Sequence, residues 1–350
     1  MPGYVYPLLV AFSLTSLLTP LVRAAACRAG LLKLPCERSV HDLPVPNMGG
    51  LAMIAGFVSA CLLYVKAESI AVVPILIGCL LSLLLGMLDD IRPLKAGTKF
   101  ALQILIAVLA WHMGISIDFI TRPGGGLILL GWLSLPITVL WIVSVMNVVN
   151  LIDGLDGLAA GIVAIACSAL LIVALQAGQA DAVLITASLA GCALGFLPYN
   201  FNPAKIFMGD TGSMFLGFAL AAVSIEGTLK CATATALAVP VLTLGVPILD
   251  TGFALIRRVL NGKPIGQADK GHIHHQLLRK GFSQRSAVLT LYAASLLLAV
   301  GAIIVFRSSF VKGTLLTFCL SGSLIIGATK VGVLDFHEAG EKAKRSHQHR

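Results

Sequence analysis

Charged side chains are scarce in this sequence. Asp, Glu, Lys and Arg make up only 12% of its 350 residues, and 57% are hydrophobic; a soluble domain carries about 25% charged residues. No long polar block separates the apolar stretches, so nothing in the sequence resembles a linker between soluble domains. We therefore predict a single integral membrane domain over residues 1–335, followed by a basic cytoplasmic tail at 336–350.

Several familiar signatures are also missing. The eight cysteines form no Cys-x-x-Cys pair and most lie within apolar runs, which argues against a disulfide framework or a cysteine metal site. The sequence contains no P-loop, Rossmann fingerprint or nucleophile elbow. The basic residues behind the net charge of +9 lie between apolar runs, so we predict no binding to nucleic acid.

Apolar runs recur along the whole chain. A run of about twenty residues can cross a bilayer, and it is helical by default because its backbone polar groups must be satisfied within the segment. We predict an all-α polytopic membrane protein with about eleven transmembrane helices. The predicted spans are 4–23, 48–65, 69–88, 99–115, 132–150, 157–177, 181–198, 212–226, 233–256, 286–306 and 311–332. A glycine-rich stretch at 116–131 predicts a small extracytoplasmic β-hairpin.

The basic residues predict an orientation for these spans. The first run has no Lys or Arg before it and several after it, the reverse of a signal peptide, so we read it as an uncleaved span with its N-terminus outside. Most of the 25 Lys and Arg residues then fall inside, as the positive-inside rule requires, and the C-terminus is cytoplasmic. The predicted cytoplasmic loops are 24–47, 89–98, 150–157, 199–211 and 257–285.

The same threading places every unusual polar cluster on the inside, which predicts one active site built from the ends of different spans. Asp89 and Asp90 end an otherwise apolar span, where carboxylates are costly and usually functional. Lys95 and Lys99 follow, and carboxylates beside lysines suit a metal-bound phosphate. The plainer alternative is that the two Asp residues only cap a helix at the water interface.

The most informative segment is NVVNLIDGLDG at 147–157. On a helix, the three- and four-residue steps between Asn150, Asp153 and Gly157 would place them on one face. An EF-hand is excluded because its loop needs a longer ligand series that ends in Glu. A polar turn with Asp156 as the N-cap of the next helix is the alternative.

Two further clusters follow. Asp210 opens the eighth span in FMGDTGS, where it is a candidate metal ligand; the alternative is that Asp210 or Thr211 is merely the N-cap of that span. The fourth, sixth and eighth spans all begin inside, so we expect their positive ends to converge on a diphosphate. His272, His274 and His275 lie in the longest inside loop and fit phosphate binding among basic residues; a zinc site is the second reading. We interpret Asp250 as a structural ion pair with Arg257, seven residues later.

These motifs resemble the polyprenyl-phosphate N-acetylhexosamine-1-phosphate transferase family, and look closest to its WecA/TagO-like branch. The resemblance covers about residues 35–284 and follows five motifs in order. The motifs are PVPNMGG (44–50), LDDIRPLKAGTKFALQ (88–103), NVVNLIDGLDGLAAG (147–161), FNPAKIFMGDTGS (201–213) and ADKGHIHHQLLRKGFS (268–283).

The resemblance implies transfer of N-acetylhexosamine-1-phosphate from a UDP-sugar to polyprenyl (undecaprenyl) phosphate, with release of UMP. This would be the first membrane step of cell-envelope polysaccharide synthesis at a bacterial inner membrane. It implies Mg²⁺, with Mn²⁺ as the alternative, held by Asp210. The implied catalytic carboxylates are Asp89, Asp90, Asp153 and Asp156. The implied substrate-binding residues are Lys99, Asn147, Asn150, His272, His274 and His275. A homodimer remains open.

Two departures from the family pattern matter. Pro93 stands where the first motif often has a third Asp. The histidine loop reads His-Ile-His-His rather than the three consecutive histidines of the branch that uses a muramoyl-pentapeptide donor, which favours UDP-GlcNAc. A phospho-MurNAc-pentapeptide transferase is the alternative enzyme. An ion-coupled transporter is the alternative class, and it would place its polar groups near mid-membrane.

Overall fold

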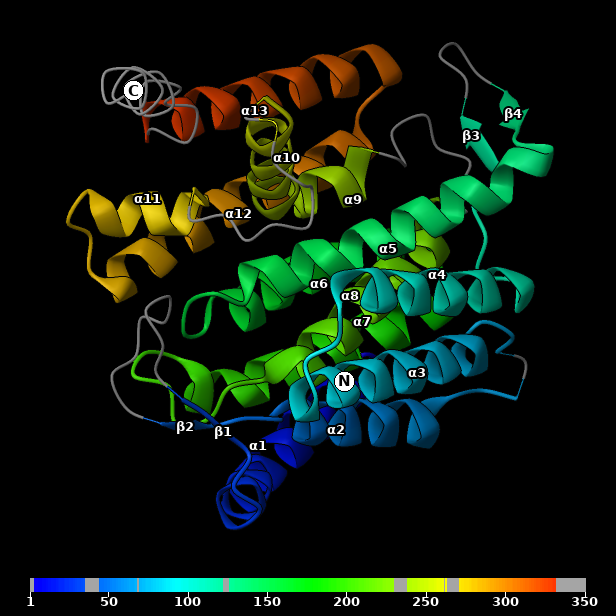
Figure 1. Cartoon of the computed structure of the whole chain (residues 1–350). Helices are drawn as coiled ribbons and strands as arrows, with labels where there is room; N and C mark the ends of the chain where they lie inside the picture. Colours follow the sequence, from blue (N-terminus) through cyan, green and yellow to red (C-terminus); the bar gives the residue numbers. More distant parts are fainter. Residues whose placement is uncertain are drawn as a thin grey trace, which may run out of the picture.

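The computed structural model describes residues 3–34, 44–67, 69–121, 126–229, 238–260, 262 and 271–331. Long helices packed side by side make up most of this part of the chain (Figure 1). The helices are α1 (Val5–Arg28), α2 (Gly50–Tyr64), α3 (Val72–Ile91), α4 (Ala96–His112), η1 (Gly131–Leu133), α5 (Ser134–Ile152), α6 (Leu158–Ala177), α7 (Ala180–Asn200), α8 (Gly209–Ser224), η2 (Ile225–Leu229), α9 (Ala238–Thr243), α10 (Gly245–Leu260), α11 (Ile273–Arg279), α12 (Gln284–Arg307) and α13 (Phe310–Lys330).

Within the described residues, seven helical segments are long and apolar enough to cross a membrane. They are α1, α3, η1 with α5, α6, α7, α12 and α13, and the shorter α2 and α4 are also apolar. The prediction of a multi-pass helical membrane protein is therefore confirmed. Each of the eleven predicted spans overlaps a helix of the structure. The predicted tail at 336–350 lies outside the described residues.

The ninth predicted span, 233–256, is not one continuous helix. Its first five residues lie outside the described part, and the rest is divided at Leu244 into α9 and α10. Gly245 begins α10 and Pro247 follows in its first turn, where proline is tolerated because the early N–H groups have no partner in the helix. In Figure 1, α10 runs steeply across the direction of α12 and α13.

Two short antiparallel strand pairs connect helices. The predicted hairpin is confirmed as β3 (Phe119–Thr121) and β4 (Leu127–Leu129). The sequence analysis did not predict the second pair, β1 (Leu32–Lys33) and β2 (Val45–Pro46). The backbone N–H of Phe207 donates to Pro46 O at 2.8 Å, so this pair ties the loop before α8 to the segment that carries Asn47.

Helix α8 is enclosed by its neighbours. Every α8 residue except Asp210 is buried, and α8 packs closely against α3, α5 and α2. Small residues make this approach possible: a β-carbon on Gly217 would lie 2.7 Å from Met146 Cα, and one on Gly86 would overlap the carbonyl of Asp210. Glycine contacts of this kind let helix backbones approach within a membrane. The helix that carries Asp210 is therefore held by close backbone contacts.

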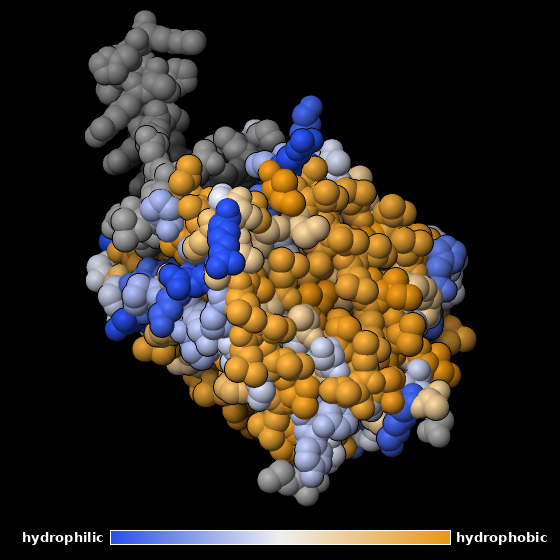
Figure 2. All heavy atoms as spheres, turned by 90° about the horizontal axis from the view of Figure 1, so that it is seen from below, coloured by the Kyte–Doolittle hydropathy of each residue, from blue (hydrophilic) through white to orange (hydrophobic). Residues whose placement is uncertain are grey.

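The surface agrees with a membrane environment. Figure 2 shows a wide apolar face, with hydrophilic side chains gathered most densely at its left edge. In Figure 1, β1, β2 and α11 lie toward the same side. Large apolar side chains such as Leu17, Leu297 and Phe318 are 69%, 69% and 72% exposed, which suits contact with lipid rather than water. The polar end of the molecule is where the site is assembled.

A matched pair of substitutions tests the packing of α8. Gly86→Ala should destabilise the protein by about 1–3 kcal/mol, since the new methyl group meets the Asp210 carbonyl in a tightly packed contact. Gly97→Ala in α4 has nothing within 4 Å and should be neutral or slightly stabilising. Thermal unfolding of both variants in detergent measures the difference. Equal melting temperatures would show that the α3–α8 contact yields easily.

Candidate active site

The carboxylate of Asp90 caps α8 from a different helix. Asp90 lies in the last turn of α3, and its Oδ1 accepts the backbone N–H of Asp210 at 3.0 Å and the side-chain amide of Asn47 at 2.9 Å. Its Oδ2 accepts the backbone N–H and the hydroxyl of Thr211 at 2.9 and 2.6 Å. The N-cap residue of α8 itself, Met208, makes no side-chain cap bond. Asp90 thus satisfies donors that a helix N-terminus leaves unpaired.

This cap changes two of the sequence-based predictions. Neither Asp210 nor Thr211 is the N-cap residue of α8, because the cap comes from Asp90 on α3. The N-terminal N–H groups of Asp210 and Thr211 were expected to face a diphosphate, and in this structure they donate to Asp90 instead. Asp90 is therefore placed to position the first turn of α8.

Asp89, the residue before Asp90, pairs with Lys99 rather than with the first turn of α8. The ammonium of Lys99 lies 2.7 Å from Asp89 Oδ2 and also pairs with Asp210 Oδ2. Asp89 Oδ1 accepts the backbone N–H of Leu94 at 2.7 Å, which fixes the carboxylate beside the start of α4. One lysine on α4 thus holds a carboxylate from α3 and another from α8. The prediction that these three residues share a site agrees with this geometry.

The two asparagines of α5 have different hydrogen-bond partners. Asn150 donates to Asp210 Oδ1 at 3.0 Å and to Ser213 Oγ at 2.9 Å, so it belongs to the carboxylate–lysine cluster. Asn147, one turn earlier, exchanges hydrogen bonds with Gln103 at 2.8 and 3.4 Å. Gln103 is four residues after Lys99 on α4. Asn147 therefore lies one helical turn away from the carboxylates, in a polar contact between α4 and α5.

Residues 153–157 form a turn within the predicted loop 150–157, so Asn150, Asp153 and Gly157 do not share the face that a continuous helix would have given them. Helix α5 ends at Ile152, and Gly157 adopts a left-handed φ of 81°, which favours glycine. Asp156 is not the N-cap of α6, since its Oδ2 accepts from Asn202 Nδ2 and from the backbone N–H of Ala204, both at 3.0 Å. Asp156 thus links this turn to the loop before α8.

Asp153, at the start of the same turn, has an unusual electrostatic setting. Burial raises the pKa of its carboxyl well above the usual range. The positive charge of Lys33 opposes this shift, and the charges of Asp210 and Asp90 add to it. A carboxyl with a raised pKa binds a proton more readily, which is the property that a general base or acid near neutral pH requires.

The three histidines come together at α11. His272 and His274 stack with ring centroids 5.5 Å apart, and the ring of His275 lies 4.3 Å from that of His274. Asp250 on α10 lies 3.1 Å from His272 Nδ1 and accepts the backbone N–H of Ile273 at 2.7 Å. The structure thus gives Asp250 a different role from the predicted ion pair with Arg257: it orients the histidine segment.

His274 connects this segment to the α5–α6 turn. A β-carbon on Gly154 would lie only 2.7 Å from His274 Nε2, so the imidazole rests directly on the backbone of the turn that carries Asp153. Burial lowers the pKa of His274 to about 3, although the negative charge of Asp250 opposes the shift. The imidazole is therefore neutral near pH 7.

The donor set suits a hard divalent cation. Among the described residues, no three His, Cys, Asp or Glu side chains group together as a metal site. Mg²⁺, however, is usually bound through one or two carboxylates together with substrate phosphates. Asp210 and Asp89 form such a pair, since both approach the same ammonium of Lys99. Two carboxylates around one lysine leave a net negative charge that fits a cation.

Comparison with known proteins identifies the family. The model for "Glycosyl transferase family 4" matches residues 72–228. A Bacillus subtilis protein is 39% identical over 323 residues, which are 91% of this chain and 89% of that protein. The chain belongs to glycosyl transferase family 4. The predicted membership of the polyprenyl-phosphate sugar-phosphate transferases is confirmed.

The names of relatives describe their activities. The Bacillus subtilis relative is a "Probable undecaprenyl-phosphate N-acetylglucosaminyl 1-phosphate transferase". A Mycolicibacterium smegmatis relative, "Decaprenyl-phosphate N-acetylglucosaminephosphotransferase", is 39% identical over 84% of this family 4 chain and 80% of its own length. A Halalkalibacterium halodurans "Phospho-N-acetylmuramoyl-pentapeptide-transferase" is 34% identical over 74% of this chain and 82% of its own length.

Several residues of this family 4 site were not assigned roles from the sequence. Asn47 lies in the quoted PVPNMGG motif, and Gln103 is at the i+4 position from Lys99, a spacing that places both on one helical face. The motif position of Asn47 and the helical spacing of Gln103 could therefore have identified both residues from the sequence. Lys33 is different: its ammonium lies 5.9 Å from the centre of the Phe207 ring, and it reaches the site through the β1–β2 pair that the sequence analysis did not predict.

Comparison of Asp90→Asn with Asp89→Asn separates positioning from chemistry. Asp90→Asn loses acceptor capacity for the first turn of α8 and should lower the stability by about 1–2 kcal/mol. Asp89→Asn removes a charge that faces Lys99 but leaves the cap intact, so it should change the melting temperature much less. Thermal unfolding of both variants, with wild type alongside, measures this. If Asp89→Asn were the less stable variant, the assigned roles would be reversed.

The buried imidazole of His274 predicts an acid-sensitive stability. Its pKa is about 3 in the folded protein and about 6.5 when unfolded. Below pH 6.5 only the unfolded state binds the proton, so stability should fall by about 2 kcal/mol between pH 6.5 and 5. Melting temperatures across this range should fall more steeply for wild type than for His274→Gln. Parallel slopes would show that another group controls the acid sensitivity.

Proposed function

We propose that this protein transfers N-acetylglucosamine-1-phosphate from UDP-GlcNAc to a polyprenyl phosphate, giving a polyprenyl-diphospho-sugar and UMP. The observation that carries the proposal is the joint ion pair of Lys99 with Asp89 and Asp210. This ammonium can exchange its carboxylate partners for a phosphate, while the two carboxylates remain beside that phosphate. The names of the relatives at 39% identity support the same donor and acceptor classes.

We propose distinct tasks for the residues around this ion pair. Lys99 holds the acceptor phosphate, and Asp89 takes its remaining proton, so that a phosphate oxygen attacks the donor phosphate next to the sugar. Asp90 and Asn150 keep Asp210 in place through the contacts described above. Covalent catalysis by a carboxylate is the second version of this chemistry. It would leave labelled phosphate on the protein.

The remaining predicted residues are proposed to bind the donor. The imidazole of His274 rests on the α5–α6 turn, and the rings of His272 and His275 lie beside it, so imidazole N–H groups can donate hydrogen bonds to a diphosphate there. Asp153 occupies the same turn with a raised pKa and is the candidate for proton exchange on this side. Asp210 would hold Mg²⁺, or Mn²⁺, which would supply charge neutralisation for the leaving UMP.

The proposed setting is the inner membrane of a bacterium with the site at the cytoplasmic face. Eleven spans with the N-terminus outside satisfy the positive-inside rule, and the nucleotide sugar is a soluble cytoplasmic compound. The gathering of the polar site residues at helix ends also favours an enzyme over a transporter, whose ligand site would lie near the membrane midplane. A homodimer is the proposed alternative to a monomer.

A reconstituted reaction tests the function directly. Purified protein in detergent receives radiolabelled UDP-GlcNAc, undecaprenyl phosphate and Mg²⁺, and lipid-linked product is measured by extraction. Product should form with wild type, disappear with EDTA, and fall at least a hundredfold in Asp89→Asn, since the group facing the acceptor is then uncharged. Gly322→Ala on α13, where the new methyl group would meet nothing within 4 Å, serves as the control variant.

Each other outcome has a definite meaning. Transfer from UDP-MurNAc-pentapeptide, with no product from UDP-GlcNAc, would replace the proposed donor by that of the 34% identical relative. Wild-type turnover in Asp89→Asn would remove Asp89 from the chemistry. Full activity after complete removal of divalent metal would exclude the proposed metal.

A further inference from the structure

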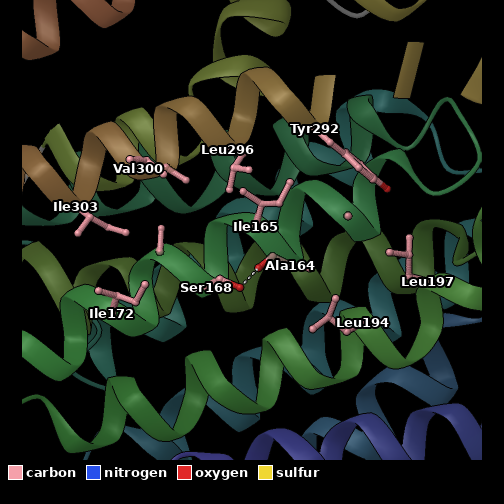
Figure 3. A pocket seen from close by; sticks show the side chains of 13 residues that line it. Ala164, Ile165, Ser168, Ile172, Leu194, Leu197, Tyr292, Leu296, Val300 and Ile303 are labelled. Carbon is pink, nitrogen blue, oxygen red and sulfur yellow. Dashed lines mark hydrogen bonds between the residues drawn. The ribbon is translucent and has the colours of Figure 1, made fainter. Parts of the chain in front are cut away.

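A groove lies between α6, α7 and α12 (Figure 3). Asp89, Lys99 and Asp210 are not among the residues that line it. Its volume is about 350 Å³, and apolar side chains such as Ile165, Leu194 and Leu296 line it. The lining has two hydroxyl groups. Ser168 Oγ donates to Ala164 O at 2.8 Å, and Tyr292 Oη donates to the carbonyl of Gly157. The groove therefore presents hydrocarbon surface to any ligand.

The length and place of the groove match one leaflet of a bilayer. On α12 the lining runs from Tyr292 to Ile303, which is roughly 16 Å along a helix. The hydrocarbon core of a bilayer is about 30 Å thick. Both α6 and α12 are long and apolar enough to span it. Tyr292 lies at the end of the groove next to the α5–α6 turn, and Ile303 at the other end (Figure 3).

A cation lies in line with the groove. Arg285 is exposed and precedes Tyr292 by seven residues, two helical turns, so both lie on the same face of α12. Its Nε donates to the carbonyl of Asn202 at 3.0 Å, which fixes the guanidinium at the active-site end of the molecule. Guanidinium groups bind phosphate oxygens with paired, charge-assisted hydrogen bonds. An apolar channel that ends at an arginine is complementary to a lipid with an anionic headgroup.

We propose that this groove binds an acyl chain of an anionic membrane phospholipid, with the phosphate at Arg285. Polyprenyl phosphate, the proposed acceptor, does not fit this groove well. Its phosphate is proposed to bind Lys99 on α4, which does not line the groove, and a long polyprenyl chain would extend beyond a single leaflet. The site would therefore serve a lipid that is not consumed.

The bound lipid would steady the active-site turn. Arg285 holds Asn202, whose side chain donates to Asp156, and Tyr292 donates to Gly157 at the end of the same turn. Filling the groove restricts Tyr292, and neutralising Arg285 by a phosphate restricts the loop that carries Asn202. The lipid thus acts on the positioning of the turn without touching the reacting groups.

Native mass spectrometry of delipidated protein titrated with phosphatidylglycerol tests the proposal without any turnover, so the result is independent of the proposed reaction. Wild type should retain one phosphatidylglycerol in preference to phosphatidylcholine. Ser168→Phe, which fills the groove, and Arg285→Gln should each lower the bound fraction at least fivefold. Matched controls are Leu297→Phe, an exposed α12 position outside the lining, and Arg307→Gln at the far end of α12.

Melting curves and size-exclusion profiles check that each variant is folded, and Ala299→Leu replaces Ser168→Phe if the latter does not fold. Wild-type binding in the groove-filling variant overturns the proposal, as does equal binding of phosphatidylcholine. Displacement of phosphatidylglycerol by polyprenyl phosphate, together with loss of polyprenyl phosphate binding in Ser168→Phe, would assign the groove to the acceptor. Conversion of a dimer to a monomer by Ser168→Phe, without any change in lipid binding, would assign it to a second copy of the chain. Both results overturn the proposal.

Discussion

The hydrogen bonds from the first turn of α8 to Asp90 fix the position of Asp210, and the rest of the site depends on them. Asp210 in turn orders Lys99 and Asn150, and Lys99 orders Asp89. One carboxylate of the adjacent pair is thus committed to building the site, while the other faces its cation. Adjacent acidic residues that look equivalent in a sequence can in this way acquire separate duties, because consecutive side chains on a helix point in different directions.

The global fold was accessible from the sequence because the bilayer restricts the choices so strongly. Apolar runs of sufficient length must be helices in lipid, and all eleven predicted spans overlap helices in the structure. The hairpin around residues 119–129 was also predicted. The break at Leu244 and the short helix α11 were not, because they depend on local proline and glycine geometry and on a side chain contributed by another helix, Asp250.

The site was predictable as a set of residues but not as a set of contacts. Motif order and topology brought the acidic and histidine clusters to one end of the molecule, and the carboxylates, Lys99 and Asn150 do meet there. The three- and four-residue spacing would place Asn150, Asp153 and Gly157 on one face only of a continuous helix, whereas α5 ends at Ile152 and the chain turns within the predicted loop. No sequence rule indicates that Asp90 caps a helix more than a hundred residues away, because such a contact exists only after α3 and α8 have packed together.

The enclosure of α8 has a consequence for how heat inactivates the enzyme. Active-site segments usually belong to the least stable parts of a protein and open before the rest. Here Asp210 and Thr211 begin a helix whose other residues are buried against α2, α3 and α5. Displacing them means pulling apart the centre of the bundle. Loss of catalytic power on warming should therefore coincide with collapse of the whole membrane domain, with no inactive but otherwise intact form preceding it.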